Sequence, residues 1–396
     1  MTVRILQGDC REVLRTLADA SVQCIVTSPP YFGLRDYGTG TWVGGDPGCA
    51  HGVRRWEGEK QTQGAQSGKA AAVDRLARER CACGATRVDR QIGLEPTPEA
   101  FIAGLLEVFR ECRRVLRDDG TLWLNMGDSY HSTSTYNAPR NSGGAFGRVD
   151  SPRQPNVHGV DGLKPKDLIG IPWMLAFALR ADGWYLRQDI IWAKPNPIPE
   201  SVRDRCTKAH EYLFLLSKSP RYYFDAEAIA EPIADSSVAR LSQPNLENQA
   251  GSDRVPGKTN GAMKAVGPRF GGNKYGDDDR EESRTKSGNE WTGNSSGRRN
   301  KRSVWTVSTK PFKEAHFATF PPDLIKPCIL AGCPEGGVVL DPFGGAGTTG
   351  LVADRLQRDA ILIELNPEYI DIARRRIAGD APLFTETSVE MTHAMA

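Results

Sequence analysis

The N-terminal part of the sequence holds a short turn that could do chemistry, Ser28-Pro29-Pro30-Tyr31. It follows an apolar run at 22–26, and two consecutive prolines stop both strands and helices, so the turn is expected at the carboxyl end of a strand. The Ser28 hydroxyl and the Pro29 carbonyl offer two acceptors on a backbone with fixed φ angles. They could hold an aromatic amino group, a poor nucleophile, in the geometry needed for attack.

Tyr31 adds a flat aromatic face on which a planar ligand can stack. Such a site needs no strong base, because positioning the amino group relative to an electrophile supplies much of the rate. The structural alternative is a Pro-Pro turn that only ends a strand. The turn alone does not distinguish these interpretations.

A glycine-rich segment near the C-terminus satisfies the G-x-G-x-x-G pattern, with Gly345, Gly347 and Gly350. Such glycines let the backbone approach a ligand closely, and Glu364 ends the next predicted strand, where a carboxylate can accept hydrogen bonds from ribose hydroxyls. A structural turn or an ordinary dinucleotide site fits the pattern equally well. Only 46 residues follow Gly350, too few for the second half of a dinucleotide fold, so the remaining strands must come from the N-terminal part.

Alternating strands and helices must position these two segments. Strands are predicted at 4–6, 22–26, 120–126, 185–192, 211–217, 338–343 and 360–364, and helices at 10–18, 97–116, 166–181, 349–356 and 366–377. The helix at 97–116 has Thr97 as N-cap, Pro98 in its first turn and an apolar stripe. This alternation predicts an α/β fold with a mostly parallel sheet.

Taken together, Thr27–Tyr31 and Asp341–Thr349 resemble the motifs of amino-methylating DNA methyltransferases with the β-type motif order. In that family the catalytic motif comes first, a target-recognition region follows, and the cofactor loop is C-terminal. The similarity covers residues 1–40, 92–130, 163–228 and 304–380. The resemblance implies a circularly permuted, Rossmann-like S-adenosylmethionine-dependent methyltransferase fold with an inserted target-recognition region.

Under this resemblance the chain divides into a catalytic part at 1–228 with an insertion at 42–91, a target-recognition region at 229–303, a cofactor-binding part at 304–380 and a tail at 381–396. The region 229–303 carries aromatic residues and the basic run Arg298–Arg302, which could follow phosphates and read bases. We expect it to be partly disordered without DNA; a solvated linker is the alternative.

The resemblance also assigns roles to individual residues. The catalytic motif is Ser28, Pro29, Pro30 and Tyr31. The residues assigned to cofactor binding are Asp9, His316, Phe317, Ala318, Thr319, Phe320, Asp341, Phe343, Gly345, Gly347, Thr348 and Glu364. The expected reaction moves a methyl group from S-adenosylmethionine to the exocyclic amino group of a base flipped out of double-stranded DNA.

Serine at the first position of the catalytic motif, in place of Asp or Asn, resembles the cytosine-N4 enzymes more than the adenine-N6 enzymes. Cytosine N4 is therefore the predicted target, with adenine N6 as the alternative. An NAD-dependent oxidoreductase would leave the Ser28–Tyr31 turn unexplained, and a non-catalytic nucleic-acid-binding protein would need neither the glycine loop nor Glu364. Methylation of RNA or of a protein glutamine keeps both features.

A second candidate site lies in the 42–91 insertion, where Cys49-Ala-His51 and Cys81-Ala-Cys83 flank a charged stretch. Four such ligands in two pairs suggest a structural zinc site. The one-residue gaps are tighter than the common two-residue spacing. The alternative is reduced cysteines in a loop.

Composition limits the remaining possibilities. With 51 basic and 49 acidic residues the net charge is +2, so DNA binding must come from local patches. The start of the sequence has no apolar signal segment, and the apolar stretch 169–179 is too short to span a bilayer, so we expect a cytoplasmic protein without membrane contact. A homodimer and a companion restriction endonuclease are further candidate partners that the sequence does not decide.

Overall fold

The computed structural model describes residues 1–33, 39–51, 80–131, 162–234, 298–309, 320–380 and 386–391. The chain divides by its contacts into two units, Met1–Asp225 with Ser303–Ala396, and Ala226–Arg302. Within its described residues the second unit contains one small antiparallel sheet, formed by β8 (Glu231–Pro232) and β9 (Arg298–Arg299). All other described helices and strands belong to the first unit.

A nine-stranded sheet forms the centre of the first unit, in the order β10-β6-β7-β5-β2-β11-β12-β1-β13. Its neighbours pair in parallel, except that β7 is antiparallel to both β5 and β6. The strands are β1 (Thr2–Gln7), β2 (Val22–Thr27), β5 (Leu116–Met126), β6 (Tyr185–Ala193), β7 (His210–Ser217), β10 (Val304–Thr306), β11 (Val338–Asp341), β12 (Asp359–Glu364) and β13 (Glu386–Met391). The predicted α/β fold with a mostly parallel sheet is confirmed.

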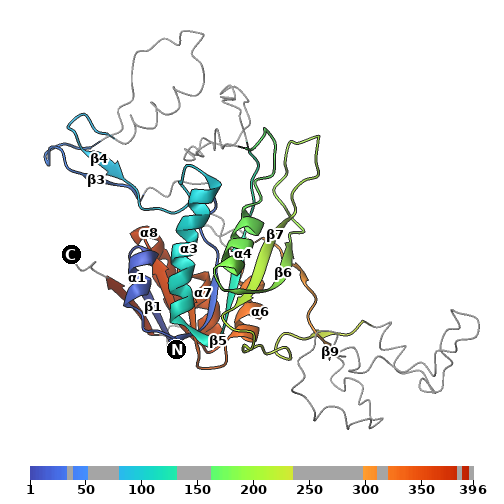
Figure 1. The fold of residues 1–396 in the computed structure, drawn as a ribbon. Helices are drawn as coiled ribbons and strands as arrows, with labels where there is room; N and C mark the ends of the chain where they lie inside the picture. Colours follow the sequence, from blue (N-terminus) through green and yellow to red (C-terminus); the bar gives the residue numbers. More distant parts are fainter. Residues whose placement is uncertain are drawn as a thin grey trace, which may run out of the picture. The chain divides into compact units, whose positions relative to one another are not determined.

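Helices cover both faces of this sheet (Figure 1). On one face lie α1 (Cys10–Thr16), α3 (Pro98–Val115) and α4 (Ile171–Ala181), and α3 packs against both α1 and α4. On the other face lie α6 (Pro322–Gly332), α7 (Thr348–Arg355) and α8 (Pro367–Asp380), and α7 packs against both α6 and α8. The helices that follow the adjacent strands β2 and β11 therefore lie on opposite faces. The carboxyl ends of these two strands form a topological switch point, where open α/β sheets bind ligands.

Helix α3 shows how the sequence sets these elements. The Thr97 hydroxyl accepts a hydrogen bond from the Ala100 amide at 3.1 Å, so the predicted N-cap is confirmed. The predicted apolar stripe is buried, including Phe101, Leu105 and Phe109, and burial of each such side chain contributes about 1.5–3 kcal/mol to the stability of the fold.

Among the described residues, no helix has the length and apolarity needed to cross a membrane.

Helix α4 begins at Ile171 and not at the predicted residue 166, so this boundary was wrong. Lys166 and Gly170 have φ angles of 72° and 86°, in the left-handed region that a helix cannot contain. The Asp128 carboxylate accepts hydrogen bonds from the amides of Gly170 and Ile171 at 3.0 and 3.1 Å. A residue distant in sequence thus caps the helix.

Two further segments, the expected tail and the 42–91 insertion, form strands that the sequence analysis did not predict. The segment expected to be a tail, 381–396, contributes the edge strand β13, whose Glu390 pairs with Arg4 of β1 at 2.9 Å. Its sequence is largely polar and exposed, so no hydrophobic alternation marked it. The 42–91 insertion includes most of a separate antiparallel hairpin, formed by β3 (Thr41–Val43) and β4 (Thr86–Val88).

Candidate active site

The carboxyl ends of β2 and β11 are joined by a buried bridge of hydrogen bonds. Asp341, at the end of β11, accepts hydrogen bonds from the hydroxyls of Thr27 and Thr349, each at 2.6 Å. It also accepts one from the Phe343 amide at 3.0 Å. The proline turn and the glycine bend, distant in sequence, therefore meet at neighbouring strand ends, as the sequence predicts.

A cavity of about 390 Å³ lies at this edge of the sheet. Its volume falls within the roughly 300–1,000 Å³ typical of ligand pockets. The structure brings together on its wall most of the predicted site residues, namely Asp9, Ser28, Pro29, Pro30, Tyr31, Phe320, Asp341, Phe343, Gly345, Thr348 and Glu364. Ile198, whose side chain is 86% exposed, adds an apolar surface.

The remaining predicted cofactor residues are not placed on this wall. Gly347 does not line the cavity; its φ is 76°, and a Cβ there would lie 2.8 Å from the Cβ of Ala373. A glycine is needed here so that the start of α7 can pack against α8. Four other predicted residues, His316, Phe317, Ala318 and Thr319, lie outside the described residues.

Glu364 holds the glycine bend in shape. Its two carboxylate oxygens accept hydrogen bonds from the amides of Gly345 and Asn366, each at 2.8 Å. Burial raises the pKa of Glu364 above its ordinary value, and these amide hydrogen bonds oppose the rise. Because each oxygen has a second acceptor direction, the carboxylate can still accept hydrogen bonds from ligand hydroxyls.

Asp9 connects the cavity to the start of α1. As N-cap of α1, Asp9 accepts a hydrogen bond from the Arg11 amide at 2.9 Å. It also forms an ion pair with the Arg11 guanidinium at 2.5 Å. The same guanidinium donates to the Arg90 carbonyl at 2.9 Å. The charge of Asp9 is therefore compensated within the protein, and Asp9 helps to hold residue 90 at the cavity.

A polar network around Tyr31 was not assigned from the sequence. The Tyr31 hydroxyl donates to the Glu211 carboxylate at 2.7 Å, and the Asn125 amide donates to the same oxygen at 3.3 Å. Lys194 forms an ion pair with the other oxygen of Glu211. Lys194 and Glu211 both line the cavity, at the end of β6 and the start of β7. The available signal in the sequence was the position of these two ionisable residues, Lys194 just after the strand predicted at 185–192 and Glu211 at the start of the strand predicted at 211–217.

The Ser28 hydroxyl forms no hydrogen bond with any residue that the structure describes. Ser28 itself is half-buried. Pro29, the next residue, is buried and forms part of the cavity wall. Among the described residues, none therefore competes with a ligand for this hydroxyl.

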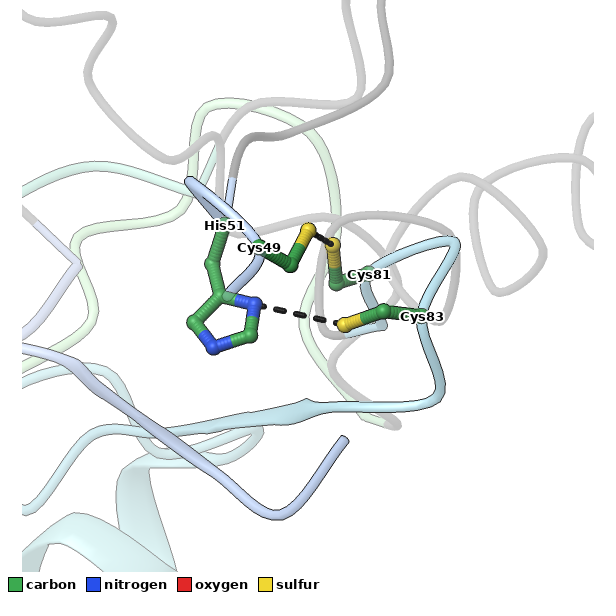
Figure 2. Close-up of side chains that lie close together, drawn as sticks. All are labelled: Cys49, His51, Cys81 and Cys83. Carbon is green, nitrogen blue, oxygen red and sulfur yellow. Dashed lines mark hydrogen bonds between the residues drawn. The ribbon is translucent and has the colours of Figure 1, made fainter. Parts of the chain in front are cut away.

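The four predicted metal ligands also converge. The ligand atoms of Cys49, His51, Cys81 and Cys83 all lie within 4.8 Å of one another. Figure 2 shows the sulfur of Cys49 facing that of Cys81, at 3.7 Å, and Nδ1 of His51 facing the sulfur of Cys83, at 3.3 Å. The structure therefore forms a cluster of three thiols and one imidazole from two distant sequence segments.

A protein-family model described as DNA methylase matches residues 22–375, which include both motifs and most of the cavity wall. The chain is an N6/N4-family DNA methyltransferase. Membership of this family makes it an S-adenosylmethionine-dependent enzyme that methylates DNA.

Curated relatives agree with this assignment over nearly the whole methyltransferase. The type II methyltransferase M.Cfr9I of Citrobacter freundii is 41% identical over 377 residues, covering 95% of this chain and 88% of the relative. M.SmaI of Serratia marcescens is 38% identical over 374 residues, covering 94% and 90%. The solved PvuII DNA methyltransferase, described as cytosine-N4-specific, superposes with a TM-score of 0.48 at 14% identity over 98% of this chain and 96% of that one.

The Asp341 bridge should make the stability of the methyltransferase depend on pH. Burial raises the pKa of Asp341 from 3.8 to about 6, although the hydrogen bonds from Thr27 and Thr349 oppose the rise. The pKa of Asp341 is higher in the folded state than in the unfolded state, so protonation of this carboxyl stabilises the fold. This stabilisation is complete below the pKa of the unfolded state and is lost as the pH rises through about 6. Between about pH 4 and pH 8, wild-type free energy of unfolding should fall by about 2–3 kcal/mol relative to Asp341→Asn.

Urea unfolding at a series of pH values measures this difference. Asp371→Asn is the matched control, because Asp371 is an exposed carboxylate on α8 whose loss should leave the pH profile unchanged. Parallel profiles for the wild type and Asp341→Asn would show that the buried carboxyl does not titrate as described.

Proposed function

We propose that this methyltransferase transfers a methyl group from S-adenosylmethionine to N4 of a cytosine that is flipped out of double-stranded DNA. The observation that carries the proposal is the Asp341 bridge, which brings the Ser28–Tyr31 turn and the glycine bend onto one cavity. The order of these elements in the chain supports a circularly permuted, Rossmann-like fold, because the catalytic strand β2 precedes the cofactor strands β11 and β12. The target-recognition region at 229–303 would be the insertion between them.

The glycine-bend side of the cavity fits S-adenosylmethionine. The Glu364 carboxylate can accept hydrogen bonds from ribose hydroxyls, and the rings of Phe343 and Tyr369 line the cavity where a purine can pack. Gly345 has a φ of 48°, and a Cβ there would have only the Phe343 carbonyl within 4 Å, so the backbone leaves the space open. When bound, the cofactor supplies an electrophilic methyl group carried on a sulfonium.

The proline-turn side would hold the amino group that is methylated. The Ser28 hydroxyl and the Pro29 carbonyl are the acceptors for its two N–H groups, and their fixed positions favour a tetrahedral nitrogen. Tyr31 would stack against the flipped base. Its hydroxyl is held by Glu211, so the orientation of its ring is set before the base arrives.

The preference for cytosine rests on Ser28, a neutral acceptor at the position where an anionic Asp would stand in the alternative form of the motif. Mass spectrometry of nucleosides from plasmid DNA, isolated from cells that express the enzyme, tests it. N4-methylcytosine is the expected product, and cells carrying Ser28→Ala provide the control. N6-methyladenine as the sole methylated base would overturn the choice of base, whereas the absence of any methylated base would contradict the whole proposal.

DNA recognition by residues 229–303 stays a prediction. Within the described part of this region, the Glu231 carboxylate pairs with Arg299 at 3.2 Å and Arg302 at 2.6 Å. These two members of the basic run are therefore partly neutralised within the protein. A homodimer and a companion restriction endonuclease also remain predictions.

A further inference from the structure

We infer that Cys49, His51, Cys81 and Cys83 bind a structural zinc ion, and that this ion keeps the β3–β4 hairpin folded beside the cavity. The metal site stands on its own geometry. Its effect on the cavity rests on the proposed function.

The spacing of the ligand atoms matches tetrahedral zinc. With Zn–S bonds of about 2.3 Å and a Zn–N bond of about 2.0 Å, ligand atoms around a tetrahedral ion are about 3.5–3.8 Å apart. The Cys49 and Cys81 sulfurs are 3.7 Å apart, and the Cys83 sulfur is 3.3 Å from Nδ1 of His51. A disulfide would need about 2.05 Å between sulfurs. The thiols are therefore unbonded and already close to metal-binding spacing.

Two tight turns present these ligands in spite of the one-residue gaps. In the first, the Cys49 amide donates to the Asp46 carbonyl at 3.0 Å, and the His51 amide donates to the Cys49 carbonyl at 2.8 Å. In the second, the Gly84 amide donates to the Cys81 carbonyl at 3.0 Å. Each turn directs two side chains toward the other turn (Figure 2). A two-residue gap is therefore not required.

Four protein ligands complete a tetrahedral site and leave no position for a substrate or a water, which is the mark of a structural zinc. None of the four residues lines the cavity. The hairpin needs such support because β3 and β4 pair at only three positions, and a two-stranded hairpin is marginal in water. Val43 and Val88 are 58% and 42% exposed, so apolar burial contributes little there.

The base of this hairpin forms part of the cavity wall. Thr39, just before β3, and Arg90, Gln91 and Ile92, just after β4, all line the cavity. The Thr39 hydroxyl donates to the Asp89 carboxylate at 2.9 Å, which ties the two sides of the base together. Zinc at the other end of the hairpin would keep this wall in place.

Elemental analysis of the full-length enzyme, purified without chelator, tests the metal site directly. About one zinc per chain is expected, and Cys81→Ser and Cys83→Ser should each lose most of it. Cys206→Ser, at an exposed cysteine outside the cluster, should keep its zinc. Co²⁺ added to metal-free wild type should give the visible absorption of tetrahedral thiolate coordination. Zinc near zero together with no such absorption would overturn the site.

Calorimetric titration with S-adenosylhomocysteine tests the link to the cavity. Cys83→Ser should bind this ligand severalfold more weakly than Cys206→Ser. If Cys83→Ser loses zinc yet binds as tightly, the structural link between the hairpin and the cavity is wrong. Zinc bound in a protein that shows no methylation of DNA would support the metal site and count against the proposed function alone.

Discussion

Replacing Ser28 by alanine is expected to lower the turnover number for DNA methylation about 100-fold, the usual effect of removing one preorganised hydrogen-bonding group from a transition state. The Ser28 hydroxyl lines the cavity and is uncommitted within the described part of the chain, so alanine removes an acceptor without leaving a protein donor unpaired. The affinity for S-adenosylhomocysteine should stay unchanged, because Ser28 lies on the side of the cavity assigned to the base.

Single-turnover assays with a radiolabelled methyl donor, combined with calorimetry, separate these two effects. Ser21→Ala is the matched control, since its hydroxyl donates to the Ala18 carbonyl and does not line the cavity. A Ser28→Ala enzyme with wild-type turnover would remove the hydroxyl from the mechanism. A loss of cofactor affinity equal to the loss of rate would reassign Ser28 to cofactor binding.

Replacing Glu364 by alanine is expected to weaken binding of S-adenosylhomocysteine by at least about 100-fold. The substitution removes the acceptor for the Gly345 and Asn366 amides, so the bend loses two charge-assisted hydrogen bonds as well as its acceptor for ligand hydroxyls. Glu364→Gln should bind with intermediate affinity, because it keeps one carbonyl oxygen but places an amide donor against a backbone N–H.

Calorimetric titration again provides the measurement, with Glu368→Ala as control. Glu368 lies in the same region, at the start of α8, but is exposed and is not on the cavity wall. Circular dichroism establishes that each variant is folded before affinities are compared. Unchanged affinity in folded Glu364→Ala would place the cofactor elsewhere.

Elements with strong local signals were predictable from the sequence. Thr97 with Pro98 marked the start of α3, the two prolines after Thr27 marked the end of β2, and the glycines after Asp341 marked the strand-to-helix bend. Each of these depends on backbone chemistry within a few residues. The meeting of the two motifs followed from the order of the elements, because parallel strands share a carboxyl edge.

Features that depend on tertiary contacts were harder to predict from the sequence. Glu211 reaches Tyr31, and Lys194 reaches Glu211, only because β7 pairs antiparallel with both β5 and β6, which brings distant positions to one edge. Similarly, α4 starts late because Asp128, from the end of another strand, caps it. Gly347 matched a ligand-binding pattern but serves packing against Ala373, a distinction that only the neighbouring helix reveals.

A crystal structure of the enzyme with S-adenosylhomocysteine would show directly whether the methyl donor and the Ser28–Tyr31 turn share one cavity. Nucleoside density against Glu364 and Phe343, with the sulfur directed toward Ser28 and Pro29, is the predicted result. Density for the ligand outside this cavity, or inside it with the sulfur directed away from the proline turn, would contradict the account.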